Sequence, residues 1–363
     1  MNHESNIEIQ TIETQTSAKT KNLKRLKIFG GLLTVLGVGL FAYFVYSVGL
    51  HLIFSGIRRI GFGGFALILF LYFLRIAARA LAWKLSVNES YRLNLSDTLP
   101  AVIIGEALSS LIPLGVLVSG TAKAFAVKRR VPMVVGLSSV ATENLFYSLV
   151  TGLFIVCGAF AFLRNFDLDA GWIFTIDVFI AVIFFLVVLG FTVIIRQWHL
   201  FSSLGEWLYN RNFFRRFLEL RRVQVRLFEN LVFDFYRNYP RRFFPIFILQ
   251  AVFHALGIAE VWFVLNRIST ANLFNSFLLE SMSRVITIVF KLVPFLIGVD
   301  EAGAQFVTKT LALGASIGVT LAIIRKGRIL FWTATGLFLI VRREISLGEI
   351  LRPDEILDND SRK

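Results

Sequence analysis

The sequence predicts an all-α polytopic membrane protein with about six full transmembrane helices and two oppositely facing re-entrant helical hairpins. Three observations support this class: the composition, the long apolar runs and an internal repeat. Of the 363 residues, 56% are hydrophobic and only 17% are charged, whereas soluble domains average about 45–50% apolar and about 25% charged residues. With 38 Phe and a mean hydropathy of +0.70, a chain of this length cannot hide its apolar surface in a soluble fold.

The apolar runs are long enough to cross a bilayer, which takes about 20 residues. Those predicted to span it are residues 28–50, 61–84, 134–163, 172–195, 243–266 and 317–341. Two further apolar stretches, 98–126 and 272–315, are interrupted, the first by Pro113, Gly115 and Gly120 and the second by Pro294. The loops on both sides of the first broken stretch are basic and are therefore predicted to be cytoplasmic. We accordingly interpret each broken stretch as a re-entrant hairpin.

Most of the basic residues lie in loops that a single orientation places in the cytoplasm. The net charge is +14, and Lys and Arg gather around residues 84–92, 123–130, 196–242 and 342–352. The positive-inside rule then places both termini in the cytoplasm, although Arg58 and Arg59 fall outside and count against this topology. No basic and aromatic module stands apart from the apolar runs, so no nucleic-acid partner is expected.

The segment 196–242 is predicted to contain an amphipathic helix in the cytoplasmic interface. The apolar residues that recur at helical spacing are Phe217, Leu220, Leu227, Leu231 and Phe235. A basic linker with a membrane-facing stripe explains this pattern more simply than a specific lipid-binding site.

An internal repeat relates the two halves of the sequence. Residues 65–85 match 244–264, residues 111–125 match 292–306, and residues 144–153 match 328–337. The shared Pro, Trp and Gly positions are the main evidence for this match, because apolar sequences align easily by chance. Each unit would contain three crossings, so the second unit would be inverted relative to the first. Inverted repeats with Pro/Gly-interrupted segments are typical of transporters with a site near the midplane.

The repeat divides the chain into four parts. These are a polar cytoplasmic tail (1–22), a first membrane repeat (23–163), a second membrane repeat (164–341) with the basic amphipathic segment 196–242 inside it, and a cytoplasmic tail (342–363).

Ionisable and polar residues inside the apolar runs are the candidate site residues, because a charge at the centre of a span costs about 2.5–3.5 kcal/mol and faces the protein interior. The candidates for lipid or substrate binding are Arg75, Arg79, Glu106, Ser109, Glu143, Arg284, Lys291, Asp300, Glu301, Arg325 and Arg328. No catalytic residue, metal ligand or cofactor site is predicted, since neither metal-ligand spacing nor a phosphate-binding loop is present.

Several candidates have an alternative explanation. Arg75 and Arg79, one turn apart, could hold a lipid phosphate or pair with membrane carboxylates. Glu106 and Ser109 could line a cavity or bond the backbone of their own hairpin. Lys291 could neutralise a phosphate.

The second hairpin leaves similar choices open. Arg284 could also neutralise a phosphate or pair with Glu280 one turn away. Asp300 and Glu301 are predicted to lie at the N-terminus of a half-helix over residues 302–313, where the helix dipole favours anions.

Two further hypotheses concern charges on the long spans. The repeat places Glu143 and Arg328 at neighbouring positions of equivalent helices, so we predict that Glu143 pairs with Arg328 or Arg325. The alternative is that both arginines extend to the head groups. His254 and Glu260 are interpreted mainly as packing residues, with proton coupling as the alternative.

Some of these residues also carry a resemblance to a known family. The matching pieces are Arg79…Trp83, Pro113-Leu-Gly with Lys128-Arg129-Arg130, Glu143, Pro294-Phe-Leu-Ile-Gly-Val-Asp-Glu-Ala-Gly303 and Arg325…Gly336-Leu337. Nearly the whole chain beyond residue 25 resembles the membrane domain of the lysylphosphatidylglycerol synthase/flippase family and its stand-alone flippase-like relatives. The Pro…Gly-Val-x-Glu-x-Gly segment is the most specific piece. The stretch after Pro113 is less rich in glycine than is usual in the family.

The resemblance implies an inner-membrane protein that moves, or helps to move, a charged or glycosylated lipid between leaflets. We expect the membrane to be a bacterial inner membrane and the lipid to be anionic or glycosylated. The protein's expected partners are membrane lipids, whether phospholipid, glycolipid or polyprenyl-linked, and its oligomeric state is left open. The alternative is a non-transporting membrane scaffold for a lipid-modifying enzyme or glycosyltransferase. We do not expect an enzyme, because lysyl transfer belongs to a separate soluble domain and 22 residues follow Val341.

Overall fold

A computed structural model of the protein describes residues 50–111, 115–166, 170–199, 202–203, 207, 222–269, 272–290, 293–296 and 298–343. This described part is helical and contains no β-strand. The predicted span 28–50 therefore lies outside the described residues except for Leu50, as do both predicted tails. Pro113, Lys291 and the loop 167–169 also lie outside them.

The helices of the first half agree with the predicted bounds to within a few residues. They are α2 (Leu50–Ile60), α3 (Phe62–Leu85), α4 (Leu95–Leu111), α5 (Gly115–Ala126) and α6 (Met133–Asn165). Helices α4 and α5 pack against each other, and residues 112–114 between them lie outside the described residues. Gly115 and Gly120, expected to contribute to the break, lie inside α5. The sequence reasoning missed α2, a short amphipathic helix that buries Ile57 and Ile60 and exposes Arg58 and Arg59.

The second half also follows the predicted pattern. Its elements are α7 (Ala170–Arg196), α10 (Arg222–Asn238), η1 (Pro240–Arg242), α11 (Phe243–Ile268), α12 (Leu273–Val289), η2 (Pro294–Leu296), α13 (Val299–Thr310) and α14 (Ala315–Arg342). The predicted amphipathic helix is confirmed for residues 222–238, where Phe235 is buried and Leu227 is exposed. Phe217 and Leu220 lie outside the described residues.

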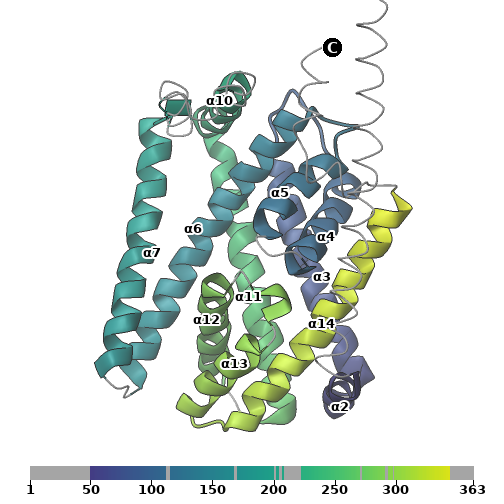
Figure 1. Ribbon diagram of the computed structural model, residues 1–363, viewed down its shortest axis with the longest axis vertical. Coiled ribbons are helices and arrows are strands. Elements are labelled where there is room, and N and C mark those ends of the chain that lie inside the picture. The colour runs from purple at the N-terminus through teal and green to yellow at the C-terminus, as the bar shows by residue number, and fades with distance from the viewer. Residues whose placement is uncertain are drawn as a thin grey trace, which may run out of the picture.

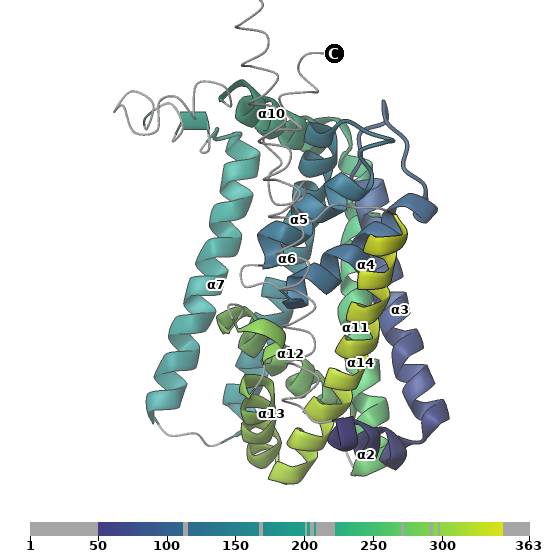
Figure 2. The ribbon, with the colours of Figure 1, turned by 45° about the vertical axis from the view of Figure 1, so that its right-hand side comes forward.

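The long helices run between two ends of the molecule, marked by α10 and by α2 (Figures 1 and 2). The helix pair α4–α5 lies in the half nearer α10, and the pair α12–α13 lies in the half nearer α2. The two pairs approach each other, since α4 contacts η2, and Leu111 at the end of α4 shares an apolar cluster with Phe295 of η2.

Each short helix pair packs against the long helix of the other half of the chain. Helix α4 lies along α14, and α12 lies along α6, while α3 and α11 pack against each other. The flanking helices follow the same rule, because α2 contacts α14 and α10 contacts α6. The two halves are therefore interleaved through shared contacts.

The interior between these helices is closely packed. Trp83 is fully buried, and its indole N–H donates to the Ser139 hydroxyl on α6 at 3.0 Å. Around the α11–α12 contact, Leu265, Leu278 and Leu279 are fully buried. Helix α7 differs because it packs mainly along α6 and exposes apolar side chains such as Phe185, which is 63% exposed. Such a helix is stable only where the surroundings are apolar.

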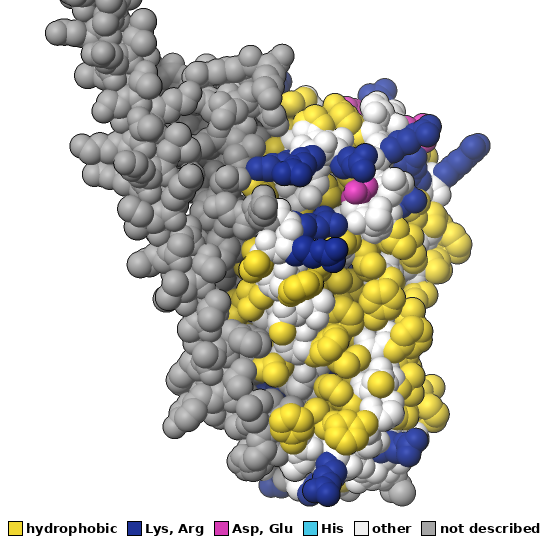
Figure 3. Space-filling view, turned by 90° about the vertical axis from the view of Figure 1, so that its right-hand side faces the viewer, with side chains coloured by type: hydrophobic (Ala, Val, Ile, Leu, Met, Phe, Trp, Pro, Cys, Tyr) yellow, Lys and Arg dark blue, Asp and Glu magenta, His cyan; other side chains and the backbone are white. Residues whose placement is uncertain are grey.

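Within the part of the chain that the structure describes, four helical segments are long and apolar enough to cross a membrane: Phe62–Leu85, Met133–Asn165, Ile173–Gly190 and Pro240–Ile268. Helix α14 is also long enough to cross a membrane, but Arg325, Lys326 and Arg328 interrupt its apolar sequence. Hydrophobic side chains cover the middle of the face in Figure 3, and Lys and Arg gather mainly toward its two ends. This distribution is that of an integral membrane protein.

Candidate functional site

Among the described residues, most of the buried charged side chains form three groups where the long helices pack, whereas buried Glu229 on α10 pairs separately with His199 and Ser202. We name the first the α4–α5 cluster; it comprises Arg79, Glu106, Lys123 and Glu143. We name the second the central cluster; it comprises Arg75, Glu260, Glu280, Arg284, Asp300, Arg325 and Arg328. The third group is the pair of Lys326 and Glu301.

Arg79 organises the α4–α5 cluster. Its guanidinium donates to both carboxylate oxygens of Glu143, at 3.0 and 3.1 Å, and to Glu106 at 2.7 Å. It also lies over the ring of Tyr147, 4.4 Å from the ring centre. Lys123 approaches Glu143 at 3.8 Å. Two cations thus face two carboxylates, which leaves this cluster neutral.

The predicted partner of Glu143 is wrong. Glu143 pairs with Arg79, receives a hydrogen bond from Gln250 at 2.9 Å, and is 1% exposed. Arg328 pairs instead with Glu260 on α11. The repeat placed Glu143 and Arg328 at similar depths, but depth does not decide which face of a helix a residue occupies. The alternative of arginines reaching the head groups is wrong too, because Arg325 and Arg328 are buried.

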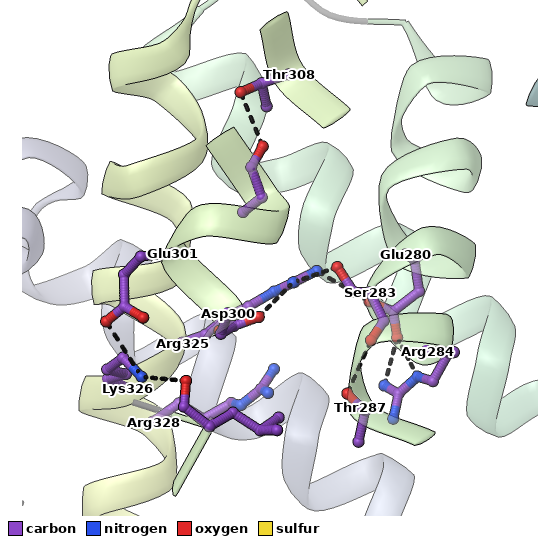
Figure 4. A network of polar contacts seen from close by, with 12 residues as sticks. Glu280, Ser283, Arg284, Thr287, Asp300, Glu301, Thr308, Arg325, Lys326 and Arg328 are labelled. Atoms are coloured by element: carbon purple, nitrogen blue, oxygen red, sulfur yellow. Dashed lines mark hydrogen bonds and ion pairs between the residues drawn. The ribbon is translucent and has the colours of Figure 1, made fainter. Parts of the chain in front are cut away.

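Glu280 on α12 is the centre of the second group (Figure 4). It accepts hydrogen bonds from Arg75 at 3.1 Å, from Arg284 at 3.1 Å and from Arg325 at 3.1 Å. The predicted pair between Arg284 and Glu280 is therefore confirmed. Arg325 also donates to the Ser283 hydroxyl at 2.6 Å and lies 3.9 Å from Asp300.

Arg75 and Arg328 share a second carboxylate, that of Glu260 on α11. Arg75 approaches it at 3.4 Å, and Arg328 forms a close ion pair with it. Arg75 therefore bridges Glu260 and Glu280, and so connects α3 to α11 and α12. Of the two explanations offered for Arg75 and Arg79, the structure shows pairing with carboxylates for both.

The third group holds the turn of the second hairpin. The Lys326 ammonium donates to the backbone carbonyls of Phe295 and Leu296 at 3.3 and 3.4 Å and pairs with Glu301 at 3.2 Å. Asp300 and Glu301 lie in the first turn of α13, as predicted, and this helix begins at Val299 rather than 302. Both side chains face α14 (Figure 4).

The described charges of the central cluster do not balance. Its four cations are Arg75, Arg284, Arg325 and Arg328, and its three carboxylates are Glu260, Glu280 and Asp300. One positive charge is therefore in excess among the residues that the structure describes. An excess charge in a low-dielectric interior is costly, so an anion near the cluster would be stabilised.

A cavity of about 1110 Å³ lies between α6, α7, α12 and the junction of α10 with α11. Its walls are mostly apolar, with Ile155, Val182, Leu186 and Phe247 among them. Arg284 lines the cavity and joins it to the central cluster. A chamber with apolar walls and a few polar groups is the usual form of a small-molecule site.

The remaining candidates are distributed around these groups. Ser109 is half-buried on α4, three residues after Glu106, and Lys291 lies outside the described residues. His254 is buried, with its Nε2 3.0 Å from the Thr151 hydroxyl. Among the described residues, no group of three or more His, Cys, Asp or Glu could hold a metal ion.

Sequence reasoning missed several members of the clusters. Lys123, Gln250 and Lys326 were not considered as site residues, and Glu260 was interpreted mainly as a packing residue. The signal that could have found them is their position within apolar runs, since a buried polar group must have a partner. This rule would have predicted a cationic partner for each carboxylate in an apolar run.

The fold and the buried charges define a polytopic helical membrane protein whose polar centre lies among its transmembrane helices. The particular family follows from comparison with known families. The model of the family described as the lysylphosphatidylglycerol synthase TM region matches residues 28–336, and the chain belongs to this family. No curated protein and no solved structure matches the chain.

Proposed function

We propose that the protein moves an anionic or glycosylated lipid between the two leaflets of a membrane. One observation carries this proposal: the ends of two short helix pairs meet in the interior, beside a buried cluster with excess positive charge and a cavity with apolar walls. The cluster offers a charged environment for a head group, and the cavity offers an apolar one for acyl chains.

We further propose that the two helix pairs are re-entrant hairpins of an inverted repeat. Exchanging α3, α4, α5 and α6 with α11, α12, α13 and α14 converts the α4–α14 contact into the α12–α6 contact. The hairpins lie in opposite halves of the molecule. Irregular backbone at membrane depth is tolerated only where protein or a cavity surrounds it, and the buried Phe295 in η2 agrees with this requirement.

The proposed setting is a bacterial inner membrane, with six spans and both termini in the cytoplasm. The α10 end would then be cytoplasmic, because exposed Arg226, Arg237 and Arg241 lie there, as the positive-inside rule requires. Helix α2, with Arg58 and Arg59, would lie at the opposite surface as an interfacial helix.

The chemistry proposed for the site is electrostatic and involves no covalent step. A phosphate brought into hydrocarbon loses its hydration, and guanidinium groups replace part of it through charge-assisted hydrogen bonds. Because Glu280 accepts from three arginines, one of them can turn to a head group while the carboxylate keeps two partners. This sharing lowers the cost of exposing a cation to the lipid.

Reconstitution into vesicles tests this proposal. The purified protein is placed in liposomes that contain a trace of lipid labelled on its head group, and a membrane-impermeant reductant quenches the label in the outer leaflet. Protein-free vesicles lose about half the signal, whereas vesicles with an active protein should lose nearly all of it. Labelled anionic phospholipid, glycolipid and polyprenyl phosphate are compared.

The matched controls are Glu280→Gln, which removes the shared carboxylate, and Glu89→Gln, which changes a surface carboxylate that is 66% exposed. Only the first should slow lipid movement. No acceleration with any of the three lipids would contradict the proposal. Copurification with a lipid-modifying enzyme would then favour the scaffold.

A further inference from the structure

The cavity between α6 and α7 has polar residues in two separate regions of its lining and mainly apolar residues between them. Gln197, Tyr236 and Arg237 line it where α7 ends and α11 begins. Arg284 and Thr287 line it near the end of α12. The wall between these regions is formed mainly by apolar residues of α6 and α7.

Arg284 has one edge of its guanidinium available to a ligand. Its Nε and Nη2 donate to Glu280, and its Nη1 donates to no described residue. The side chain is 18% exposed, compared with 1% for Arg75, 7% for Arg325 and 9% for Arg328. Of the four arginines in the central cluster, Arg284 is therefore the one that presents a donor to the cavity.

We propose that this cavity is a binding site for a phospholipid whose head group has a net negative charge, with its phosphate on Nη1 of Arg284 and an acyl chain between α6 and α7. The excess positive charge of the central cluster selects against a head group that carries its own cation. A zwitterionic head group brings its ammonium toward that excess charge, and a cationic one adds to it. The site thereby distinguishes lipids by net charge.

This inference rests on the proposed function for its lipid substrate, but binding and movement are measured separately. The binding test uses the purified full chain in a neutral detergent. It is titrated with dioleoylphosphatidylglycerol, which is anionic, with dioleoylphosphatidylcholine, which is zwitterionic, and with dioleoyl trimethylammonium propane, which is cationic. Microscale thermophoresis gives an apparent Kd for each lipid.

The anionic lipid should bind about tenfold more tightly than the zwitterionic one, because the phosphate is ionised in both lipids but only the zwitterionic head group brings an ammonium toward the excess positive charge. The cationic lipid should bind most weakly. Arg284→Gln should reduce the preference to within about twofold, and Arg284→Lys should keep most of it, since the charge remains. Equal affinities in the wild type, or an unchanged preference in Arg284→Gln, would overturn the inference.

A second variant keeps the inference testable if Arg284→Gln does not fold. Leu186 lines the cavity from α7 and is 56% exposed, so Leu186→Trp fills the apolar part without touching the central cluster. This variant should bind both lipids at least fivefold more weakly, by loss of acyl-chain space, and should retain the preference for the anionic one. Unchanged affinity would place the lipid elsewhere and overturn the inference.

The two proposals can fail independently. Selective binding of the anionic lipid without lipid movement in vesicles supports the cavity site and contradicts transport. Lipid movement that shows no dependence on head-group charge or on Arg284 supports transport and contradicts the cavity site.

Discussion

The helix pairs α4–α5 and α12–α13 differ in where their charged side chains find partners. The charges of the first pair, Glu106 and Lys123, meet Arg79 and Glu143 from the same half of the chain, and the result is neutral. Glu280 of the second pair reaches Arg75 in the first half as well as Arg325 on α14. The first pair is therefore satisfied locally, whereas the second links the two halves and carries the excess charge.

This contrast predicts that the second pair is more sensitive to loss of a carboxylate. Glu280→Gln leaves Arg75, Arg284 and Arg325 without their shared partner, so it should lower the free energy of unfolding by about 3–5 kcal/mol. Equilibrium unfolding with SDS in mixed micelles measures the effect. Glu89→Gln, at the surface, should stay within about 0.5 kcal/mol of the wild type. A loss of stability in Glu280→Gln as small as that in Glu89→Gln would mean that the second pair does not depend on this carboxylate.

The α4–α5 cluster, tested at Glu143 of α6, should respond less strongly. Glu143→Gln should cost about 3 kcal/mol, at the lower end of the range for a broken buried pair, because Arg79 keeps Glu106. A double-mutant cycle with Arg79→Gln should give a coupling energy of about 0.5–3 kcal/mol.

The same cycle between Glu143 and Arg328→Gln is the control, and its effects should add to within about 0.5 kcal/mol. Strong coupling to Arg328 would mean that the two halves are linked through Glu143 after all.

Glycines lie where each short helix pair packs against the long helix of the other half, and they allow the two contacts to be compared. A Cβ at Gly336 of α14 would collide with Ala107 of α4, and one at Gly158 of α6 would collide with Ser281 of α12. Each Gly→Ala change should cost about 1–3 kcal/mol through overpacking, again measured by SDS unfolding. A Cβ at Gly190 on α7 has open space around it, so Gly190→Ala should be neutral or slightly stabilising. Equal behaviour of all three glycines would show that the two contacts are loose.

The smallest effect on stability is expected from cysteines that report topology. In a Cys157→Ser background, Arg58→Cys on α2 and Arg241→Cys in η1 change exposed positions and should leave the free energy of unfolding within about 0.5 kcal/mol of the background. A membrane-impermeant thiol reagent applied to intact cells should label position 58 and should reach position 241 only after lysis. Labelling of both positions in intact cells would exclude hairpins that open to opposite sides.

The helices and their ends could be predicted from the sequence because length and hydropathy alone decide which segments fit a bilayer. Helices α3, α6, α7, α11 and α14 begin and end within a few residues of the apolar runs. Helix α2 was missed, since its 11 residues fall below the length of a span and its apolar residues merge with the run before it.

The ion pairs were predictable only where partners are close in sequence. Arg284 and Glu280 lie one helical turn apart, so their contact follows from helix geometry. Glu143 and Arg79 are 64 positions apart, and their contact depends on how α3 and α6 are rotated about their axes. A repeat gives the approximate depth of a residue but leaves that rotation open.

The bonds from Lys326 to the turn of the second hairpin have a consequence for biosynthesis. Phe295 and Leu296 both adopt left-handed backbone conformations, with φ of 53° and 52°, which are uncommon for bulky residues. Their carbonyls accept from a lysine on α14, a helix that the ribosome completes only after the turn itself has emerged. The hairpin therefore cannot acquire these bonds, or the ion pairs of Asp300 and Glu301, until the last described helix has entered the membrane. A nascent chain arrested before α14 would hold α12 and α13 without the α14 side chains that pair with Asp300 and Glu301 and bond the η2 turn.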